Sequence, residues 1–318
     1  MAAAQLSSQS TSRAASARTA PALDVVIVVC DGARELTRAC LESLREHPLR
    51  SAPMSVHVVD NASSDGTAEM ITADFDEVTL RRMSWNSGFC IANNVALRDT
   101  DAPYALLLNP DTVVSEGALD HMVELMERRR EIGIAGCRLV QLDGTFDHAA
   151  KRAFPTPLGA LAHFAGLGRG GSNGRLAQYR APEIGEHDAG AVDAVNGAFM
   201  LVRRSAMDEV GLLDEAYWTY MEDLDWCYRF KQHGWTVYYE GGVTIVHVKG
   251  GTSVAAAGRR ARHRGLRSTW AFHRGMGRFY RKFYAGRRPP LDAAVYVAII
   301  GKFVVAATRS AIARRSLR

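Results

Sequence analysis

The apolar residues in the first half of the chain recur with two spacings, one typical of buried strands and one of amphipathic helices. Residues 25–29 form an unbroken β-branched run, which is typical of a strand buried on both faces. Leu36, Cys40 and Leu44 recur at i, i+4 and i+8, and they predict a helix over 34–46. Further strands are expected at 56–59, 78–82 and 105–108, and further helices at 67–73, 86–98 and before the arginines at 128–130. Strands that alternate with helices predict an α/β fold with a mainly parallel sheet and helices on both faces.

The second half of the chain is less regular before the pattern returns. Residues 141–190 include five glycines between 166 and 174, which predicts a mobile loop over the site. The elements expected after it are a strand at 198–202, a helix at 222–232 that Gly234 ends, and strands at 236–239 and 243–246. Ligands of a parallel sheet bind at the carboxyl ends of the strands, so polar residues that follow a strand are the first candidates for a site.

Composition sets outer limits on the architecture. Hydrophobic residues make up 47% of the 318 residues, which is enough for a sizeable core. The five cysteines lie far apart without the spacing of metal fingers, so they are expected to be small apolar core residues of a reduced, cytosolic protein. Residues 1–22 have no apolar stretch typical of a signal peptide, and we expect a disordered leader there.

Charge separates the end of the chain from the rest. Of the 39 Lys and Arg residues, 16 lie between 258 and 318, where Asp292 is the one acidic residue. This segment has a net charge of +15, whereas the remainder of the chain carries −10. The prediction is therefore a leader over 1–22, a main domain over 23–255 and a basic helical extension over 256–318.

The extension combines its charge with aromatic pairs and an apolar run. Phe279/Phe283 and Tyr280/Tyr284 are i,i+4 pairs, and the apolar run covers 293–307. Fifteen residues are fewer than the roughly 20 that span a bilayer, so a helix lying in the interface of an anionic membrane is expected. The alternatives are packing on the main domain or on a second copy of the chain. Nucleic acid is the weakest option, because no recognition motif accompanies the charge.

The first segment with candidate chemistry covers 58–67, where Asp60 and Asn61 close a predicted strand. A carboxylate at a strand end can accept hydrogen bonds from a pyrimidine ring N–H or from a ribose hydroxyl. The same residues also suit a plain turn or a helix cap, so the segment alone leaves both interpretations open.

The second segment covers 106–111 and ends in Asn109-Pro110-Asp111. Pro110 stiffens the strand exit, and Asp111 follows where a metal-bound diphosphate would lie. Mg²⁺ or Mn²⁺ held by carboxylate oxygens neutralises a diphosphate before it leaves. The alternative is again a turn, because Asn-Pro-Asp is favourable turn chemistry.

The third segment places Glu222, Asp223 and Asp225 in the first turn of a predicted helix. Acidic residues favour that position through the helix dipole alone. The functional alternative makes one of them a general base that deprotonates an acceptor hydroxyl.

The fourth segment has His247 directly after a predicted strand, followed by Lys249 and two glycines. A lone histidine there is usually structural. Beside a metal-bound diphosphate it would be a ligand, and an imidazole would favour Mn²⁺ over Mg²⁺. Lys249 and the glycine amides can also meet phosphate oxygens.

Taken together and in this order, the segments resemble the inverting family 2 glycosyltransferases with the GT-A fold, a Rossmann-like α/β fold. Within that family they are most similar to the rhamnosyltransferase-like branch, which includes enzymes that extend polyprenyl-diphosphate-linked sugars. The resemblance covers about residues 24–253 and extends more weakly into the tail. It also rests on Asn86-Ser87-Gly88-Phe89 with Asn93-Asn94, and on the segment 196–204.

The resemblance implies a role for each matching residue. Asp60 would hold the donor nucleotide, and Asp223 would be the catalytic base. Asp111 and His247 would bind the Mn²⁺ or Mg²⁺ ion. The further residues it implies are Asn61, Asp31, Asn86, Gly88, Asn109, Gly197 and Ala198 on the donor side and Glu222, Asp225 and Trp226 on the acceptor side. Asn109 stands where many family members have an acid, which implies fewer charged metal ligands.

The implied reaction is a single displacement that inverts the anomeric centre. The resemblance implies L-rhamnose from dTDP-rhamnose as the donor and a lipid-linked or polysaccharide hydroxyl as the acceptor, at the inner face of the plasma membrane. The alternatives are another donor, such as UDP-galactofuranose or a UDP-hexose, and a nucleotide-sugar-binding protein without catalysis. A nucleotidyltransferase is disfavoured, because Cys30-Asp31-Gly32 is a poor version of its phosphate loop.

Overall fold

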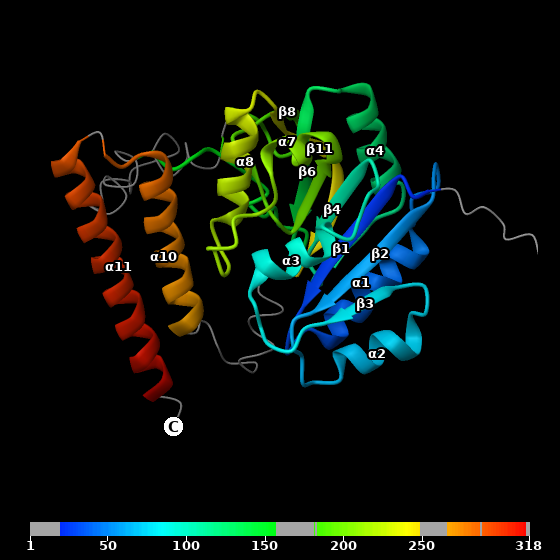
Figure 1. Cartoon of the computed structure of the whole chain (residues 1–318), viewed down its shortest axis with the longest axis horizontal. Helices are drawn as coiled ribbons and strands as arrows, with labels where there is room; N and C mark the ends of the chain where they lie inside the picture. Colours follow the sequence, from blue (N-terminus) through cyan, green and yellow to red (C-terminus); the bar gives the residue numbers. More distant parts are fainter. Residues whose placement is uncertain (1–19, 157–180, 182, 249–265, 287, 316–318) are drawn as a thin grey trace, which may run out of the picture.

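The first half of the chain forms a parallel sheet with helices between its strands (Figure 1). The computed structural model describes residues 20–156, 181, 183–248, 266–286 and 288–315. Its first elements are β1 (Leu23–Val29), α1 (Arg34–Glu46), β2 (Met54–Asp60), α2 (Thr67–Asp74), β3 (Thr79–Arg82), α3 (Phe89–Leu97) and β4 (Tyr104–Leu108). These four strands are all parallel, in the order β3-β2-β1-β4, so their carboxyl ends meet at one edge. The order of strands and helices is the one that the apolar spacing predicts.

The second half extends this sheet with strands of both directions. Its elements are β5 (Thr112–Val113), α4 (Ala118–Arg128), β6 (Ile132–Val140), β8 (Ala189–Ala191), β10 (Phe199–Arg203), α7 (Arg204–Val210), α8 (Glu222–Gln232) and β11 (Thr236–His247). The sheet continues from β4 as β10-β6-β11-β5, and β8 pairs with β11. β10 is antiparallel to both of its neighbours, whereas β6 and β11 are parallel. The result is a mostly parallel, mixed α/β sheet, as the sequence predicts.

Besides the short elements β5, β8 and α7, which the sequence does not predict, two long strands of this half differ from the sequence prediction. β6 was not predicted, because Gly133 and Gly136 interrupt its apolar run; a Cβ on either would collide with Phe230 or Val195. β11 is one strand of 12 residues rather than two strands. Its register against β6 shifts between Glu240 and Thr244, where two glycines interrupt the pattern. A glycine inside a strand pattern therefore marks close packing or a bulge here, not an end.

The core forms as the apolar spacing predicts. Cys40 and Leu44 of α1 are buried against the sheet, and four of the five cysteines are buried with free thiols. All of the glycine-rich segment 166–174, most of the expected leader and the predicted boundary at residue 255 lie outside the described residues.

The extension ends in two long helices, α10 (Leu266–Phe283) and α11 (Pro289–Arg315), which stand side by side next to α8 (Figure 1). Tyr228 of α8 stacks on Phe283 of α10, with ring centroids 4.1 Å apart, and Phe279 is buried in the main core. For α10, the alternative of packing on the main domain is therefore confirmed. α11 packs on α10 through Val295 and Ile299.

The apolar part of α11 is longer than the predicted 15 residues. Pro289–Ser310 has a mean hydropathy of 1.8 over its best window, and 11% of that window is buried. By length and composition alone, this one helix of the described chain is able to cross a membrane. The sequence argument that the run is too short to span a bilayer is therefore wrong, because the helix continues past both ends of 293–307.

Candidate active site

Two loops brace each other at the carboxyl ends of β1 and β2. Asp31 accepts a hydrogen bond of 2.6 Å from the Ser64 backbone N–H, and Asp65 accepts one of 2.7 Å from the Gly32 N–H. Asp60 is the last residue of β2, is 3% exposed and accepts from the Ser63 N–H at 3.1 Å. The parallel pairing of β1 with β2 thus brings the two predicted donor-side carboxylates, Asp31 and Asp60, to one edge of the sheet.

Carboxylates crowd around the end of β1. Burial, followed by the charges of Asp31, Asp65, Asp60 and Asp111, raises the pKa of the Cys30 thiol. The thiol is half-buried and lies within electrostatic range of all four carboxylates. Since β1 pairs with β4, Asp111, three residues after β4, belongs to the same edge of the sheet as the β1–β2 loops. An edge of this kind favours a bound cation.

Asn61 is buried and holds the loop that precedes α3. Its Nδ2 donates to the Gly88 carbonyl at 3.1 Å, and its Oδ1 accepts from the Ser87 N–H at 2.8 Å. Asn86 completes the loop by accepting from the Gly88 N–H at 3.1 Å. Asn61 and Asn86 are both predicted to touch the donor. In the structure they hydrogen-bond to the 86–88 loop and fix the conformation of its backbone.

Gly88 has to be a glycine. Its φ of +87° lies in the region that side chains disfavour, and a Cβ there would come within 2.3 Å of the Trp218 ring. The next amide, Phe89 N–H, donates to the Trp218 carbonyl at 2.7 Å. The helix predicted from residue 86 therefore begins at Phe89, and the Gly88 loop is packed against Trp218, which precedes α8.

The pairing of β5 with β11 joins Asp111 to His247. Thr112 pairs with His247, so Asp111 lies at the end of β11, where its carbonyl accepts from the Val248 N–H at 2.8 Å. The His247 Nε2 is 3.4 Å from Asp111 Oδ1, and its Nδ1 is 3.4 Å from Asp147 Oδ2. Burial works against a charged imidazole, but the hydrogen bonds and charges of Asp111 and Asp147 outweigh it and raise the pKa of His247 to about 9.

Asp111 and His247 together would supply two protein ligands of a metal site, one carboxylate oxygen and one imidazole nitrogen. Asp111 Oδ1 is buried, and within the described residues it makes no polar contact closer than the one with the His247 imidazole at 3.4 Å, so it is available to ligate a cation. Asp147 lies on the far side of the imidazole, the position of a carboxylate that orients a histidine ligand. No group of three His, Cys, Asp or Glu side chains in the described ranges forms a complete metal site. Mg²⁺ and Mn²⁺ commonly take their remaining ligands from phosphate and water, so the residues fit such an ion.

Asp223 projects from the first turn of α8 and forms an ion pair with Arg152. Arg152 belongs to β7 (Lys151–Arg152), which pairs with β9 (Ala194–Val195), and it also donates to the Val195 carbonyl at 2.8 Å. Both carboxylate oxygens of Asp223 accept a hydrogen bond, the second from the Leu224 N–H at 2.8 Å. The two contacts together fix the direction of the carboxylate.

The neighbouring Glu222 is in a different state. It is 8% exposed, and its Oε2 has no hydrogen-bond partner. Burial, with the charge of Asp223 second, raises the pKa of Glu222 to about 8. Glu222 therefore holds its proton near neutral pH, so Asp223 is the better proton acceptor of the two.

Gly197 and Ala198 link Asp223 to the strand that precedes Asp111. A Cβ on Gly197 would lie 3.7 Å from the Asp223 Cβ, so these two residues touch. The Ala198 carbonyl accepts from the Asn109 N–H at 2.9 Å, across the pairing of β10 with β4. The buried Ala198 and the backbone of Asn109 thus form a continuous path from Asp223 to Asp111.

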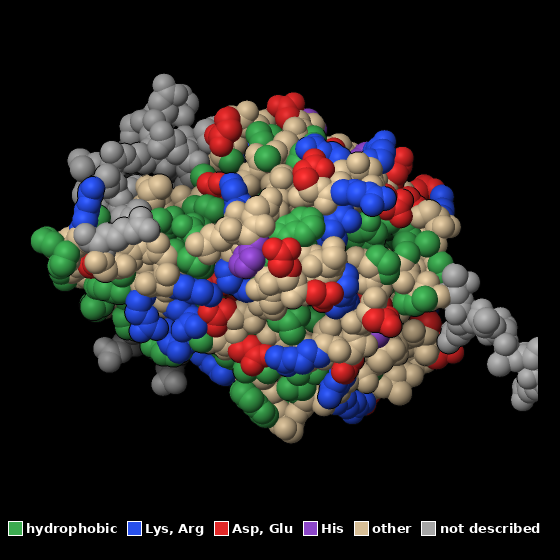
Figure 2. All heavy atoms as spheres, turned by 45° about the horizontal axis from the view of Figure 1, so that its top comes forward, with side chains coloured by type: hydrophobic (Ala, Val, Ile, Leu, Met, Phe, Trp, Pro, Cys, Tyr) green, Lys and Arg blue, Asp and Glu red, His purple; other side chains and the backbone are tan. Residues whose placement is uncertain are grey.

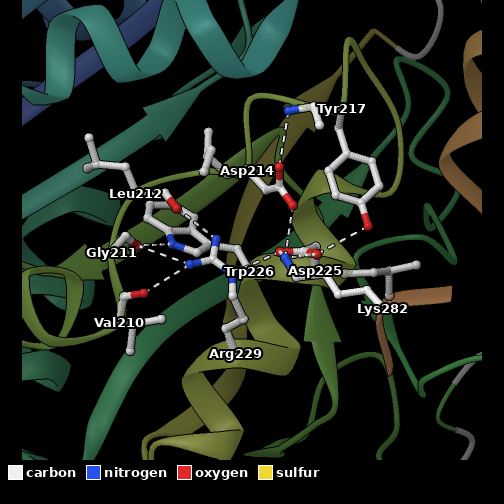
Figure 3. Close-up of polar contacts among 12 residues, drawn as sticks. Val210, Gly211, Leu212, Asp214, Tyr217, Asp225, Trp226, Arg229 and Lys282 are labelled. Carbon is white, nitrogen blue, oxygen red and sulfur yellow. Dashed lines mark hydrogen bonds and ion pairs between the residues drawn. The ribbon is translucent and has the colours of Figure 1, made fainter. Parts of the chain in front are cut away.

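Asp225 and Trp226 do not lie where an acceptor would reach them. Both are 0% exposed. Asp225 is bound by Arg229 at 2.8 Å and by Lys282 at 2.7 Å, and the Trp226 indole donates to the Gly211 carbonyl at 2.8 Å (Figure 3). Their i+3 spacing from Glu222 and Asp223 alone would put them on the same side of α8. The contacts with Arg229, Lys282 and Gly211 show instead that both side chains are held in the protein interior. The acceptor-side role predicted for these two side chains is at odds with this placement.

Arg152, Asp147 and Trp218 were missed by the sequence analysis. Asp147 and Arg152 lie within residues 141–190, the region interpreted as irregular, and Trp218 lies in the turn before α8. Each acquires its place through a long-range contact, to Asp223, His247 and Gly88 respectively. No local spacing signals such contacts.

Known proteins resemble this chain over most of the region just described. The family model described as "Glycosyl transferase family 2" matches residues 24–211. An N-acetylglucosaminyl-diphospho-decaprenol L-rhamnosyltransferase of Mycobacterium tuberculosis is 29% identical over 209 residues, which are 62% of this chain and 67% of that protein. The rhamnosyltransferase WbbL of Escherichia coli is 27% identical over 167 residues, 50% of this chain and 60% of that protein.

Among solved structures, the mannosyltransferase PcManGT of Pyrobaculum calidifontis, in complex with GDP-Man and Mn²⁺, aligns with a TM-score of 0.55 and 16% identity. The alignment covers 94% of this chain and 75% of that one. At this identity the likeness concerns the fold alone. The family match ends before α8, so Asp223 and His247 lie outside it.

Proposed function

The chain belongs to glycosyl transferase family 2, and we propose that it transfers L-rhamnose from dTDP-rhamnose, with inversion, to a hydroxyl of a lipid-linked saccharide. Glycosyl transfer itself follows from the family and from the rhamnosyltransferase relatives. The donor is inferred from the names of those relatives. The observation that carries the proposal is the meeting of Asp111 and His247 at the edge that also holds Asp60.

In the proposed reaction, Asp223 accepts the proton of the acceptor hydroxyl as that oxygen attacks the anomeric carbon. Arg152 pairs with the carboxylate and fixes its direction toward the acceptor. The nucleoside diphosphate leaves from the opposite face, so one displacement inverts the configuration. Asp60 and the 86–88 loop bind and orient the nucleotide, and Gly197 leaves space for the sugar next to Asp223.

A divalent cation fits the same arrangement. Asp111 and His247 would hold Mn²⁺ or Mg²⁺, and Asp147 would orient the imidazole. When bound, the cation supplies positive charge to the diphosphate of the donor.

A panel of nucleotide sugars tests the donor assignment. With Mn²⁺ present, dTDP-rhamnose at about 100 times its Kd is expected to raise the Tm of the full chain by about 5 °C or more. At the same concentration, UDP-galactofuranose and UDP-glucose, the alternative donors, are expected to raise the Tm less. A larger rise with either would overturn the rhamnose assignment, and no rise with any donor would contradict nucleotide-sugar binding. Transfer to a synthetic lipid-linked saccharide then separates an enzyme from a binding protein.

We propose further that α11 places the enzyme on an anionic membrane, where a lipid-linked acceptor is found, at its cytoplasmic face. The side of α11 that faces away from α10 exposes Val297 (70%), Ile300 (61%), Val304 (54%) and Val305 (51%). A helix that is apolar all round needs a second apolar partner. Figure 2 shows hydrophobic and Lys/Arg side chains next to each other at the end of the molecule that carries α10 and α11. The net charge of +15 over 258–318 favours anionic lipid and repels a second copy.

Flotation with vesicles tests this membrane proposal. The full chain is expected to bind vesicles of phosphatidylcholine with phosphatidylglycerol and to bind pure phosphatidylcholine vesicles more weakly. The pair Ile300→Ser and Val304→Ser is expected to lower binding at least tenfold, because apolar area is lost from the lipid face. Leu142→Ser is the matched control, since Leu142 is 75% exposed elsewhere on the molecule. Equal binding by all three proteins would reject the proposal.

A further inference from the structure

The chain takes a disfavoured path immediately before the proposed catalytic base. Tyr220 and Met221 have φ values of +68° and +74°, and the next two residues are Glu222 and Asp223. Left-handed φ is uncommon for residues with side chains, and such residues persist only where their surroundings hold them. Two in succession require a strong external support at this point.

Helix α10 provides contacts on this strained pair. A Cβ on Gly275 would lie 2.9 Å from the Tyr220 carbonyl oxygen and 3.2 Å from the Met221 Cγ, so the helix backbone lies directly against the pair. The Tyr220 hydroxyl is 2.9 Å from the Ser268 hydroxyl, and its ring meets Phe272 edge-on at 5.8 Å. Three successive turns of α10 therefore contact Tyr220 and Met221.

A charged anchor continues the contact toward the end of α10 (Figure 3). Lys282 donates to Asp225 at 2.7 Å and to Asp214 at 2.9 Å, and Arg278 donates to Asp214 at 2.8 Å. Burial opposes ionisation, but Arg278 and Lys282 outweigh it and lower the pKa of Asp214 to about 2. Because Asp214 and Asp225 lie on either side of the strained pair, the anchor ties both ends of residues 214–225 to one helix.

The same segment meets the donor side on its other face. Trp218 fills the space above Gly88 and accepts a hydrogen bond from the Phe89 N–H. Residues 214–225 are thus held between the 86–88 loop and α10. A shift of α10 would change the position of Asp223 relative to the donor loop.

We propose that α10 is a positioning element of the active site, which holds residues 214–225 in the strained conformation that places Asp223 beside Gly197 and Arg152; this inference rests on the proposed function of Asp223. Gly275 is its central positioning residue, because only a glycine allows the backbone contact. The basic extension is therefore part of the catalytic apparatus and not an appended tail. Since α11 packs on α10, a membrane bound by α11 would act on the same segment.

Two glycines of α10 provide the test. Gly275→Ala places a methyl group against Tyr220 and Met221, whereas Gly277→Ala meets nothing within 4 Å. Both changes raise helix propensity equally, so a difference between them reports the contact. Gly275→Ala is expected to lower kcat at least tenfold with a donor KM within twofold of wild type, and to speed hydrogen exchange of the 218–224 amides. Gly277→Ala is expected to match wild type in both. Equal kcat and equal exchange for the two variants would overturn the proposal.

The charged anchor gives an independent test if Gly275→Ala folds poorly. Lys282→Met is expected to lower kcat and to speed hydrogen exchange of the 218–224 amides. Lys282→Arg is expected to keep most of the wild-type kcat and protection. Arg281→Met, at an exposed neighbouring position, is the control and is expected to change neither quantity. Faster exchange without an effect on kcat would refute the positioning role. If the wild-type chain transfers no sugar, the proposed function fails, whereas the exchange measurements still decide whether α10 holds the segment.

Discussion

On the donor side, Asp60, Asn109 and Asp111 stand at the ends of strands, and backbone pairing across the sheet decides where each one lies. On the proposed catalytic side, Asp223 stands on a helix whose approach is strained and whose place depends on side chains from β7 and α10. The family match covers the first region and ends before the second. The donor side is therefore the part that the fold guarantees, and the catalytic side is the part that this chain has to stabilise with its own contacts.

Removal of the base gives the largest expected effect and tests whether the two sides are separate in function. Asp223→Asn is expected to lower kcat for transfer about 10³-fold, because the amide cannot take the hydroxyl proton. Donor affinity, measured by calorimetry, should stay within twofold. Asp208→Asn, an exposed acid on α7, is the control. Normal transfer by Asp223→Asn would remove the base assignment.

Removal of the donor-side carboxylate should show the opposite pattern. Asp111→Ala is expected to weaken donor binding about 100-fold with Mn²⁺ present and little in EDTA, because the lost interaction is made through the cation. Asp147→Asn, which weakens the contact that orients His247, is expected to lower donor affinity about tenfold. If EDTA leaves wild-type donor affinity unchanged, a metal on this side is ruled out.

A change at the contact between the two sides should damage stability. Gly88→Ala is expected to cost about 3 kcal/mol, since a Cβ would overlap Trp218 at a disfavoured φ. Gly117→Ala has a similar φ of +72° with nothing within 4 Å and should cost about 1 kcal/mol. Urea unfolding of both variants measures the difference. Equal losses would show that the Trp218 contact is not tight.

The smallest effect concerns pH and the catalytic side alone. The pKa of Glu222 is raised to about 8, so between its ordinary value of 4.5 and about 8 the folded chain binds more protons than the unfolded chain. The contribution of Glu222 to stability therefore falls as pH rises through this range. Glu222→Gln is expected to flatten that fall and to raise Tm at pH 8–9 relative to wild type. Thermal melts from pH 5 to 9 check this, and parallel curves for the two proteins would contradict it.

The sequence predicted the strand ends that carry the proposed donor side, because the signals for them are local. Buried runs such as 25–29 and turn residues such as Asn109-Pro110-Asp111 lie next to each other in the chain, and parallel pairing then brings the strand ends together. Arg152 and Lys282 could not be predicted in the same way. Each reaches its carboxylate from a distant element, and β7 itself exists only through its pairing with β9. For Asp225 the sequence predicted a substrate contact that its complete burial argues against, and burial of a single side chain cannot be read from local sequence.

The charged anchor of Arg278 and Lys282 has a practical consequence for the purification of this enzyme. Trimming the chain near residue 257 to avoid detergent would remove Arg278 and Lys282 from Asp214 and leave Asp225 with Arg229 as its one basic partner in the described chain. It would also uncover the rings around Tyr228. Buried carboxylates left alone are costly, so such a product should precipitate whether or not a bilayer matters. Truncation after Gly286 would retain α10 and remove the apolar helix α11, and it should give a protein better suited to crystallisation.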